Sequence, residues 1–269
     1  MNRKVDLHLH TYASDGEWSP AQVIENIDKH NVKVFAVTDH DEVGCIARLE
    51  PLVKDREDLT YIKGVEGTVT YRGKEHHILT YNIDETNEEL LEMIAFNRQV
   101  RNESNYRLID WLAKYYPHIS SEDYKSYDYN PYQGGWRAYG YLFENGVITD
   151  IQDYFKKVSG FEDRKVFLSA EVYLPKMKEL GFKTVLAHPP AYTDGDLYEE
   201  IHLDYFRELG LAGIECYSKY LEEQSNAKYY VNYCNKHKMV ITGGSDCHGG
   251  FVGRRIGYPD VDEGMIRLW

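Results

Sequence analysis

The sequence has few cysteines and no long apolar run, and each shortage excludes a class of protein. Its 269 residues include four cysteines, none in a Cys-X-X-Cys pair, so neither a disulfide framework nor a thiolate zinc site is indicated. No segment reaches the length of a membrane-spanning helix, and the two basic residues near the start are not followed by the apolar stretch of a signal peptide. We therefore expect a cytoplasmic protein with reduced cysteines and no membrane partner.

Basic residues are scarce as well. The chain has 31 Lys and Arg against 44 Asp and Glu, which gives a formal net charge of −13. Such a surface repels long nucleic acid, although bound divalent cations would make one cleft locally positive. Small anionic substrates are therefore compatible with this composition, and the 42% hydrophobic content is that of a globular protein.

The first third of the chain alternates β-like runs with amphipathic stretches, as β-α units do. Ser19 followed by Pro20 is typical of a helix N-terminus, and Arg72-Gly73 is typical of a hairpin turn. The elements predicted here are a strand at 4–9, a helix from 20 to about 30, a strand at 33–37 and a hairpin over 61–81.

The pattern changes at Thr86 and returns after Gly160. We predict that residues 86–160 are an inserted helical segment contributing to a substrate pocket, and that residues 1–85 and 161–269 form one barrel with the functional site. The later predicted elements are helices at 169–180, 197–209 and up to 237, and strands at 184–187, 213–215 and 239–242.

Histidine and carboxylate side chains gather where the predicted strands end. His8 and His10 alternate on the first strand and therefore project to one face. The other members of the pattern are His40, Glu66, His77, His188, Asp246 and His248. Taken alone, each histidine is more simply a surface or core residue. Together they predict a metal site, because loops after parallel strands converge at one barrel mouth and imidazole with carboxylate binds divalent metals.

These motifs, in their order, resemble those of the PHP (polymerase and histidinol phosphatase) family. They are Asp6-Leu7-His8-Leu9-His10, Ser14-Asp15-Gly16, Thr38-Asp39-His40, Gly64-Val65-Glu66, His77-Ile78-Leu79, Ala187-His188-Pro189 and Gly244-Ser245-Asp246-Cys247-His248-Gly249. The resemblance spans residues 6–257 and implies an α/β fold, a distorted (β/α)7 barrel, with a trinuclear metal centre.

The same resemblance implies a set of ligands for each metal. The sets are His8, His10, Glu66 and Asp246 for one ion, Glu66, His77 and His188 for a second, and Asp15, His40 and His248 for a third. Imidazole with carboxylate suits Zn²⁺, Mn²⁺ or Fe²⁺ better than Mg²⁺, which prefers oxygen ligands and water. We therefore expect two to three divalent ions, Zn, Mn or Fe, as cofactors.

Two further residues are candidates for a catalytic role. Asp39 precedes His40 and either orients that ligand or a metal-bound water, or serves as an ordinary turn acid. His202 is a candidate general acid because it follows His188 in a loop or helix near the predicted barrel mouth.

Three arginines are candidates for binding substrate phosphate. Arg98 and Arg101 share a face of one predicted helix, and Arg137 follows a Gly-rich loop of the insertion. Guanidinium groups match phosphate oxygens, and arginines at corresponding places in similar PHP phosphoesterases contact substrate phosphate. The alternative is a solvated helix face paired with acids such as Glu92 or Glu103.

The insertion also carries an aromatic stretch, which consists of Tyr127, Tyr129, Tyr132, Trp136, Tyr139 and Tyr141. These rings either stack a nucleobase beside the metals or pack the insertion onto the barrel. Packing is the interpretation that we favour.

The sequence as a whole predicts a metal-dependent phosphoric ester hydrolase in which a metal-bound hydroxide attacks phosphorus. The expected substrate is small and nucleotide-like: a nucleoside monophosphate, a 3′,5′-bisphosphate or the 5′ end of a short oligonucleotide. Three alternatives stay open, namely a histidinol-phosphate phosphatase, an amidohydrolase-like hydrolase and a catalytically silent metal-binding module.

Overall fold

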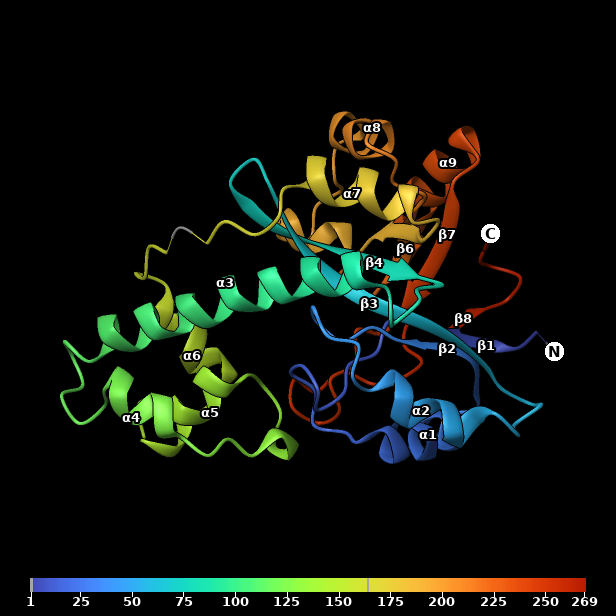
Figure 1. Ribbon diagram of the computed structural model, residues 1–269. Coiled ribbons are helices and arrows are strands. Elements are labelled where there is room, and N and C mark those ends of the chain that lie inside the picture. Colours follow the sequence, from blue (N-terminus) through green and yellow to red (C-terminus); the bar gives the residue numbers. More distant parts are fainter. Residues whose placement is uncertain (1, 164) are drawn as a thin grey trace.

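A strongly curved sheet forms the centre of the computed structural model, which describes residues 2–163 and 165–269 (Figure 1). Its strands lie in the order β7-β6-β5-β4-β3-β2-β1-β8. They are β1 (Lys4–Asp6), β2 (Val32–Val37), β3 (Thr60–Tyr71), β4 (Lys74–Tyr81), β5 (Lys183–Leu186), β6 (Gly213–Ser218), β7 (Val240–Gly244) and β8 (Val261–Asp262).

The two ends of the sheet approach each other, so the barrel nearly closes. The backbone N–H of Leu7 donates to the carbonyl oxygen of Gly243 at 3.1 Å, and Leu9 forms a parallel bridge with Cys247. The residues after β1 therefore run beside those after β7. This nearly closed α/β barrel confirms the fold class that the sequence predicted.

The hairpin of β3 and β4 distorts the barrel. Most neighbouring strands are parallel, but β4 runs antiparallel to both β3 and β5. Thr68 pairs with His77 in the hairpin register, and since side chains two residues apart share a face, Glu66 and His77 lie on the same side of the sheet. The predicted hairpin is confirmed, with its turn at Arg72-Gly73.

Helices cover the barrel and build the insertion. They are α1 (Pro20–Lys29), α2 (Ile46–Val53), α3 (Glu88–Leu112), α4 (Ser121–Ser126), α5 (Arg137–Glu144), α6 (Ile151–Val158), α7 (Ala170–Glu179), α8 (Glu200–Glu208) and α9 (Ala227–His237). The predicted start of α1 is confirmed, because Ser19 Oγ accepts a hydrogen bond from the Gln22 backbone N–H and the Gln22 side-chain oxygen accepts one from the Ser19 backbone N–H. The short elements α2 and β8 were not predicted. None of the helices in the described part of the chain is long and apolar enough to cross a membrane.

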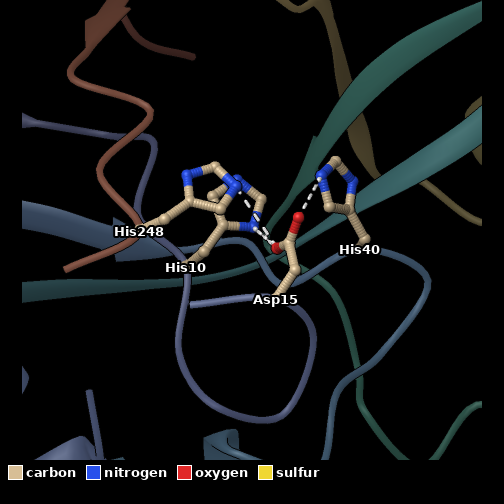
Figure 2. A group of neighbouring side chains, drawn as sticks. All are labelled: His10, Asp15, His40 and His248. Atoms are coloured by element: carbon tan, nitrogen blue, oxygen red, sulfur yellow. Dashed lines mark ion pairs between the residues drawn. The ribbon is translucent and has the colours of Figure 1, made fainter. Parts of the chain in front are cut away.

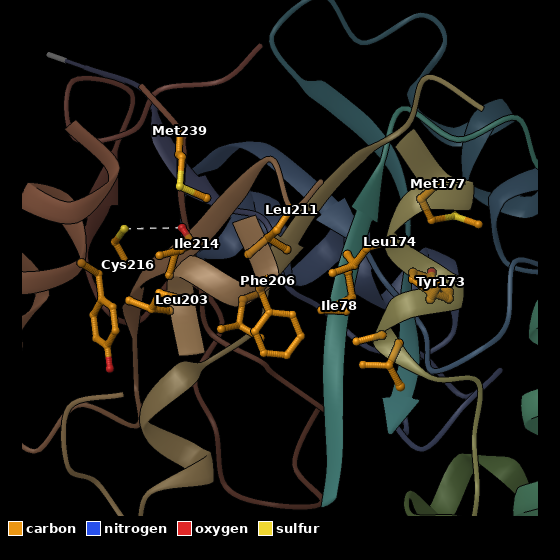
Figure 3. Packing of buried hydrophobic residues seen from close by; sticks show 14 of the residues in the cluster. Ile78, Tyr173, Leu174, Met177, Leu203, Phe206, Leu211, Ile214, Cys216 and Met239 are labelled. Carbon is orange, nitrogen blue, oxygen red and sulfur yellow. Dashed lines mark hydrogen bonds between the residues drawn. The ribbon is translucent and has the colours of Figure 1, made fainter. Parts of the chain in front are cut away.

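The main apolar core lies between the sheet and the helices α7, α8 and α9. Figure 3 shows Leu174 of α7 and Phe206 of α8 close to Ile78 of β4. Burial of each such side chain stabilises the fold by roughly 1.5–3 kcal/mol. This packing holds the strands, and with them the residues at their ends, in fixed positions.

The segment that contains α4, α5 and α6, which the sequence analysis predicts to be an insertion, has a core of its own and lies at one end of the long helix α3 (Figure 1). Its buried residues include Leu108 and Leu112 of α3, Tyr141 of α5 and Tyr154 of α6. Helix α3 is thus shared, since its first half packs on the barrel and its second half belongs to the insertion.

Candidate metal centre

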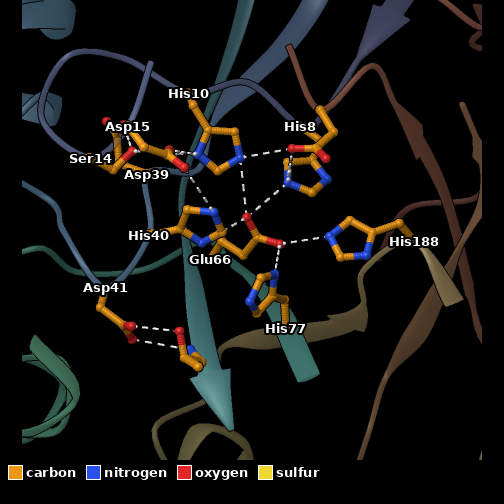
Figure 4. A network of polar contacts seen from close by, with 12 residues as sticks. His8, His10, Ser14, Asp15, Asp39, His40, Asp41, Glu66, His77 and His188 are labelled. Carbon is orange, nitrogen blue, oxygen red and sulfur yellow. Dashed lines mark hydrogen bonds and ion pairs between the residues drawn. The ribbon is translucent and has the colours of Figure 1, made fainter. Parts of the chain in front are cut away.

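The candidate metal ligands converge at one mouth of the barrel (Figure 4). They come from the residues after β1 (His8, His10, Asp15), the end of β2 (His40), β3 (Glu66), β4 (His77), the end of β5 (His188) and the end of β7 (Asp246, His248). The structure therefore brings together the nine residues that were proposed as ligands from the sequence.

Glu66 is the hub of the cluster, because five imidazoles surround its fully buried carboxylate. Oε2 lies 3.0 Å from His8 Nε2, 3.1 Å from His10 Nε2 and 3.2 Å from His40 Nδ1. Oε1 lies 3.2 Å from both His77 Nδ1 and His188 Nε2. A carboxylate with different imidazoles on its two oxygens is suited to bridge two cations.

Two further carboxylates complete the cluster. Asp246 Oδ1 lies 3.1 Å from His10 Nε2, on the same side as Glu66. Asp15 Oδ1 lies 3.2 Å from His248 Nε2, and Asp15 Oδ2 lies 3.7 Å from His40 Nε2 (Figure 2). Asp15 and His248 thus lie together at one side of the cluster, next to His10 and His40.

Three compact sets of side chains can hold a metal ion. They are His8, His10, Glu66 and Asp246; His40, Glu66 and His77; and His10, Asp15, His40 and His248. The first set is the same as one that the family resemblance implied. His10 belongs to the first and third sets, and His40 to the second and third. His188 is in none of the three sets, but its Nε2 lies 3.2 Å from Glu66 Oε1.

The chemistry of this cluster fits bound cations. The nitrogens His10 Nε2, His40 Nδ1 and His77 Nδ1 are buried and have no hydrogen-bond partner, although each is within 3.2 Å of a Glu66 oxygen. Buried polar atoms without partners are rare and call for an ion or water between them. A divalent cation would satisfy these nitrogens and the carboxylate together.

The electrostatics point the same way. Burial alone would lower the pKa of His10, but the Asp246 and Glu66 carboxylates, each 3.1 Å from its Nε2, raise it to about 9. Burial likewise opposes the charge on His77, yet the Glu66 carboxylate raises its pKa to about 10. Burial would raise the pKa of Glu66, and the surrounding imidazoles hold it well below its usual range. The buried carboxylates are therefore stabilised by positive charge beside them, which protons on the imidazoles or bound metal ions can supply.

Two of the candidate ligands have an uncommon backbone conformation. His188 has φ 29° and Asp246 has φ 51°, in a region that residues with a Cβ rarely adopt. Such conformations cost free energy and persist where the surrounding structure enforces them, often at functional sites. Here they turn both side chains back toward Glu66.

Asp39 points at the loop that carries Asp15 and away from the cavities. Its carboxylate accepts hydrogen bonds from the backbone N–H of Thr11 at 2.8 Å, from Thr11 Oγ1 at 2.7 Å and from Ser14 Oγ at 2.6 Å. These hydrogen bonds go to the loop that carries Asp15 and not to His40, so they match the turn-acid interpretation of Asp39.

Two connected cavities open onto the cluster. The larger, of about 620 Å³, is lined by Asp15, His40 and His77, and also by Arg98, Arg101 and Lys165. The smaller, of about 410 Å³, is lined by His188, Asp246 and His248. These volumes lie within the roughly 300–1,000 Å³ typical of small-molecule sites.

The three predicted phosphate-binding arginines all line the larger cavity. Arg101 donates to Thr68 Oγ1 at 2.8 Å and to Glu75 Oε1 at 3.1 Å, and Arg98 pairs with Glu42. Arg137 is more constrained, because it donates to the carbonyl oxygens of Tyr124, Lys125 and Tyr127.

His202 lies outside this site, which corrects its prediction as the general acid. Its Nδ1 is 3.0 Å from the hydroxyl of Tyr71, and it lines neither cavity. The reason is strand alternation: His76 and His77 point to opposite faces of β4, and α8, which carries His202, packs on the His76 face.

Arg254 and Tyr220 were missed by the sequence analysis. The Tyr220 hydroxyl donates to Asp246 Oδ2 at 3.0 Å, and Arg254 contacts both the Asp246 carboxylate and Tyr220. Arg254 lies six residues after His248, so a search for basic residues near the motifs would have found it.

The aromatic stretch of the insertion is mostly structural. Tyr139 and Tyr141 are buried in the insertion core, with Tyr127 and Trp136 packed against it. Trp136 also lines both cavities, as does Phe155, which lies outside the predicted stretch.

Comparison with known proteins identifies this architecture. Residues 6–130 match the family model of the PHP domain. The chain is 27% identical to the 5′-3′ exoribonuclease Rnm of Escherichia coli (strain K12), over 98% of this chain and 93% of the relative. It is 26% identical to the 3′,5′-nucleoside bisphosphate phosphatase of Chromobacterium violaceum, over 95% of this chain and 91% of that protein.

A solved structure shares the fold along almost the whole chain. The crystal structure of a candidate metal-dependent phosphoesterase from Bifidobacterium adolescentis superposes with a TM-score of 0.81 at 23% identity. The match covers 98% of this chain and 94% of that one. At this identity the likeness shows the fold alone.

Proposed function

Because this chain belongs to the PHP domain family, we propose that it is a metal-dependent phosphoesterase acting on a small nucleotide-like phosphate ester. The observation that carries the proposal is the position of the ligand cluster. Nine candidate metal ligands line the mouth of the barrel, and the cavity beside them is also lined by Arg98, Arg101 and Lys165.

The nine side chains would hold two or three cations around Glu66, with Asp246 on one side and Asp15 on the other. Imidazole-rich ligand sets favour Zn²⁺, Mn²⁺ or Fe²⁺. Cations bound here would activate a water molecule and neutralise charge on the phosphoryl oxygens.

The basic side chains of the larger cavity would bind and orient the phosphate. Arg101 is held by Thr68 and Glu75, so its guanidinium is fixed before substrate arrives. Glu75 also lies 3.2 Å from His77 Nε2 and thereby joins this arginine to a candidate metal ligand. Phosphate bound at Arg101 would thus lie beside the metal cluster.

A nucleotide-like substrate is supported by the activities of the relatives, an exoribonuclease and a nucleoside bisphosphate phosphatase. The net charge of −13 limits such a substrate to a mononucleotide or a short oligonucleotide, because a longer strand would meet repulsion outside the cavity.

Histidinol phosphate fits the cavity less well, because its amine needs an acidic partner. Apart from Asp15, which is a candidate metal ligand, the acids that line the larger cavity are already paired with Lys or Arg side chains. Glu42 pairs with Arg98, Glu75 with Arg101 and Lys165, and Asp163 with Arg107.

A panel of phosphate esters tests the proposal. The purified protein, loaded with Mn²⁺ or Zn²⁺ and separately treated with chelator, is assayed on adenosine monophosphate, adenosine 3′,5′-bisphosphate, a short 5′-phosphorylated oligoribonucleotide and histidinol phosphate. We expect metal-dependent hydrolysis with the highest kcat/KM on a nucleotide substrate. A preference for histidinol phosphate, or no hydrolysis of any ester with either metal, contradicts the proposal.

A further inference from the structure

The larger cavity is lined by polar and by apolar side chains. The polar ones include members of the metal cluster together with Arg98, Arg101 and Lys165. Apolar and aromatic side chains also line the cavity, namely Leu108, Trp136, Tyr154, Phe155 and Val158 of the insertion and the following Phe161, beside the polar Asn102, Ser104, Asn105 and Arg137. A ligand that fills this cavity therefore needs an anionic end and an apolar end.

Helix α6 presents an apolar stripe to the cavities. Ile151, Phe155 and Val158 follow one another at intervals of four and three residues, so they share a helix face. Ile151 lines the smaller cavity, Val158 lines the larger one, and Phe155 lines both. We name these three residues the α6 shelf.

Phe155 is the exposed centre of this shelf. Its side chain is 59% exposed, whereas the adjacent Tyr154 is 7% exposed and belongs to the insertion core. Packing of the insertion core explains why an aromatic residue occupies position 154. The exposed Phe155 ring contributes little to that core. A large apolar ring that stays exposed where it lines both cavities is a surface for a flat apolar group.

Trp136 supplies a second ring at the same place. It lines both cavities, and its ring meets that of Tyr154 edge-on at 4.9 Å. This contact holds the indole in one orientation, so the aromatic surface beside the metal cluster is largely preformed.

We propose that the α6 shelf, together with Trp136, is the subsite that stacks the base of the substrate, an inference that rests on the proposed phosphoesterase function. The phosphate then lies toward Arg101 and the metal cluster, across the same cavity. The shelf side chains carry no hydrogen-bonding group, so the subsite accepts any base through its π face and favours the larger purines.

Substitutions of Phe155 test this subsite against a matched control. Phe155→Ala and Phe155→Trp are compared with Phe143→Ala, since Phe143 is also exposed in the insertion, at 46%, and lines neither cavity. KM is measured for adenosine monophosphate and for ribose 5-phosphate, which lacks the base. We expect Phe155→Ala to raise KM for adenosine monophosphate, relative to KM for ribose 5-phosphate, roughly tenfold. In Phe155→Trp and Phe143→Ala this ratio should be the same as in the parent protein.

Binding of adenosine, measured by calorimetry on the same proteins, separates this subsite from the catalytic function. If no ester is hydrolysed, the phosphoesterase proposal fails, and adenosine binding that is lost in Phe155→Ala still supports the shelf. An unchanged KM ratio in Phe155→Ala, or equal adenosine affinity in parent and Phe155→Ala, overturns the subsite.

Discussion

Glu215 holds two candidate metal ligands at once. One carboxylate oxygen accepts a hydrogen bond from His8 Nδ1 at 3.0 Å, and the other accepts one from the backbone N–H of His188 at 2.7 Å. Because a carboxylate only accepts, Nδ1 of His8 carries a proton in this contact, and Nε2, on the Glu66 side, is the nitrogen that a cation would bind. One buried side chain therefore fixes a tautomer and also a backbone segment with positive φ.

Replacement of this carboxylate should weaken metal binding. In Glu215→Gln, the amide cannot accept both hydrogen bonds through two oxygens, so His8 and His188 lose their fixed positions. We expect metal affinity to fall roughly 10- to 100-fold, as measured by competition with a chromophoric chelator. The exposed Glu223, changed to Gln, is the control. An unchanged affinity in a folded Glu215→Gln protein would show that Glu215 has no such role.

Metal content should exceed one ion per chain. Nine candidate ligands are too many for a single four-coordinate site, so we expect elemental analysis to find roughly two to three transition-metal equivalents. Chelation should abolish hydrolysis, and addition of Mn²⁺ or Zn²⁺ should restore it. A chelated, metal-free protein that keeps full activity would refute the metal-dependent mechanism.

Loss of Asp246 should remove activity while the fold is retained. Asp246→Ala takes one of the three carboxylates from the cluster and leaves Arg254 without its partner. We expect kcat to fall by several orders of magnitude, on the order of 10³ or more, with an unchanged circular dichroism spectrum. Asp260→Ala, which removes an exposed partner of Lys4, should retain activity. Comparable activity in the two variants would contradict the ligand assignment.

Arg101 should contribute to phosphate binding. Hydrogen bonds to charged groups are worth about 1.5–3 kcal/mol, so Arg101→Ala should lower kcat/KM roughly 10- to 150-fold on every phosphate ester. Arg101→Lys keeps the charge without the forked geometry and should recover part of the loss. Arg207, which pairs with Asp204 on α8, provides the control for removal of a cation. If steady-state kinetics give the same kcat/KM for Arg101→Ala and Arg207→Ala, Arg101 does not bind the phosphate.

Asn97 should stabilise the junction of the insertion and the barrel. Its fully buried amide donates to Asp41 Oδ1 at 2.9 Å and to the Thr68 carbonyl at 2.7 Å, and accepts from the Leu168 backbone at 3.1 Å. Asn97→Ala leaves these groups unpaired, so we expect urea denaturation to show a loss of about 2–4 kcal/mol in the free energy of unfolding. Gln99→Ala, on the exposed face of α3, should change it little. Equal free energies of unfolding for Asn97→Ala and Gln99→Ala would contradict the stabilising role of the Asn97 hydrogen bonds.

The sequence, together with its resemblance to the PHP family, was sufficient to predict the barrel and its candidate ligands. The alternation of His8 with His10, and the placement of His40, His188 and Asp246 after apolar β-rich runs, depend on local periodicity, which a sequence contains directly. The capped start of α1 at Ser19 was predictable for the same reason.

The sequence could not decide which residues share an ion or which aromatic ring faces the cavity. His202 is near His188 in the chain, but α8 packs on the opposite face of β4, so the two side chains lie apart. Phe155 and Tyr154 are adjacent aromatics, and only the packing of α6 against the insertion core buries one and exposes the other.

The physical reason is the range of the interactions. Turn chemistry, capping and strand alternation act over a few residues, so the sequence by itself determined which side chains stand at the barrel mouth. The contacts of Glu215 with His8 and of Arg254 with Asp246 depend on how separate strands and loops are brought together. Only the tertiary structure, through closure of the sheet and packing of its helices, decided those contacts.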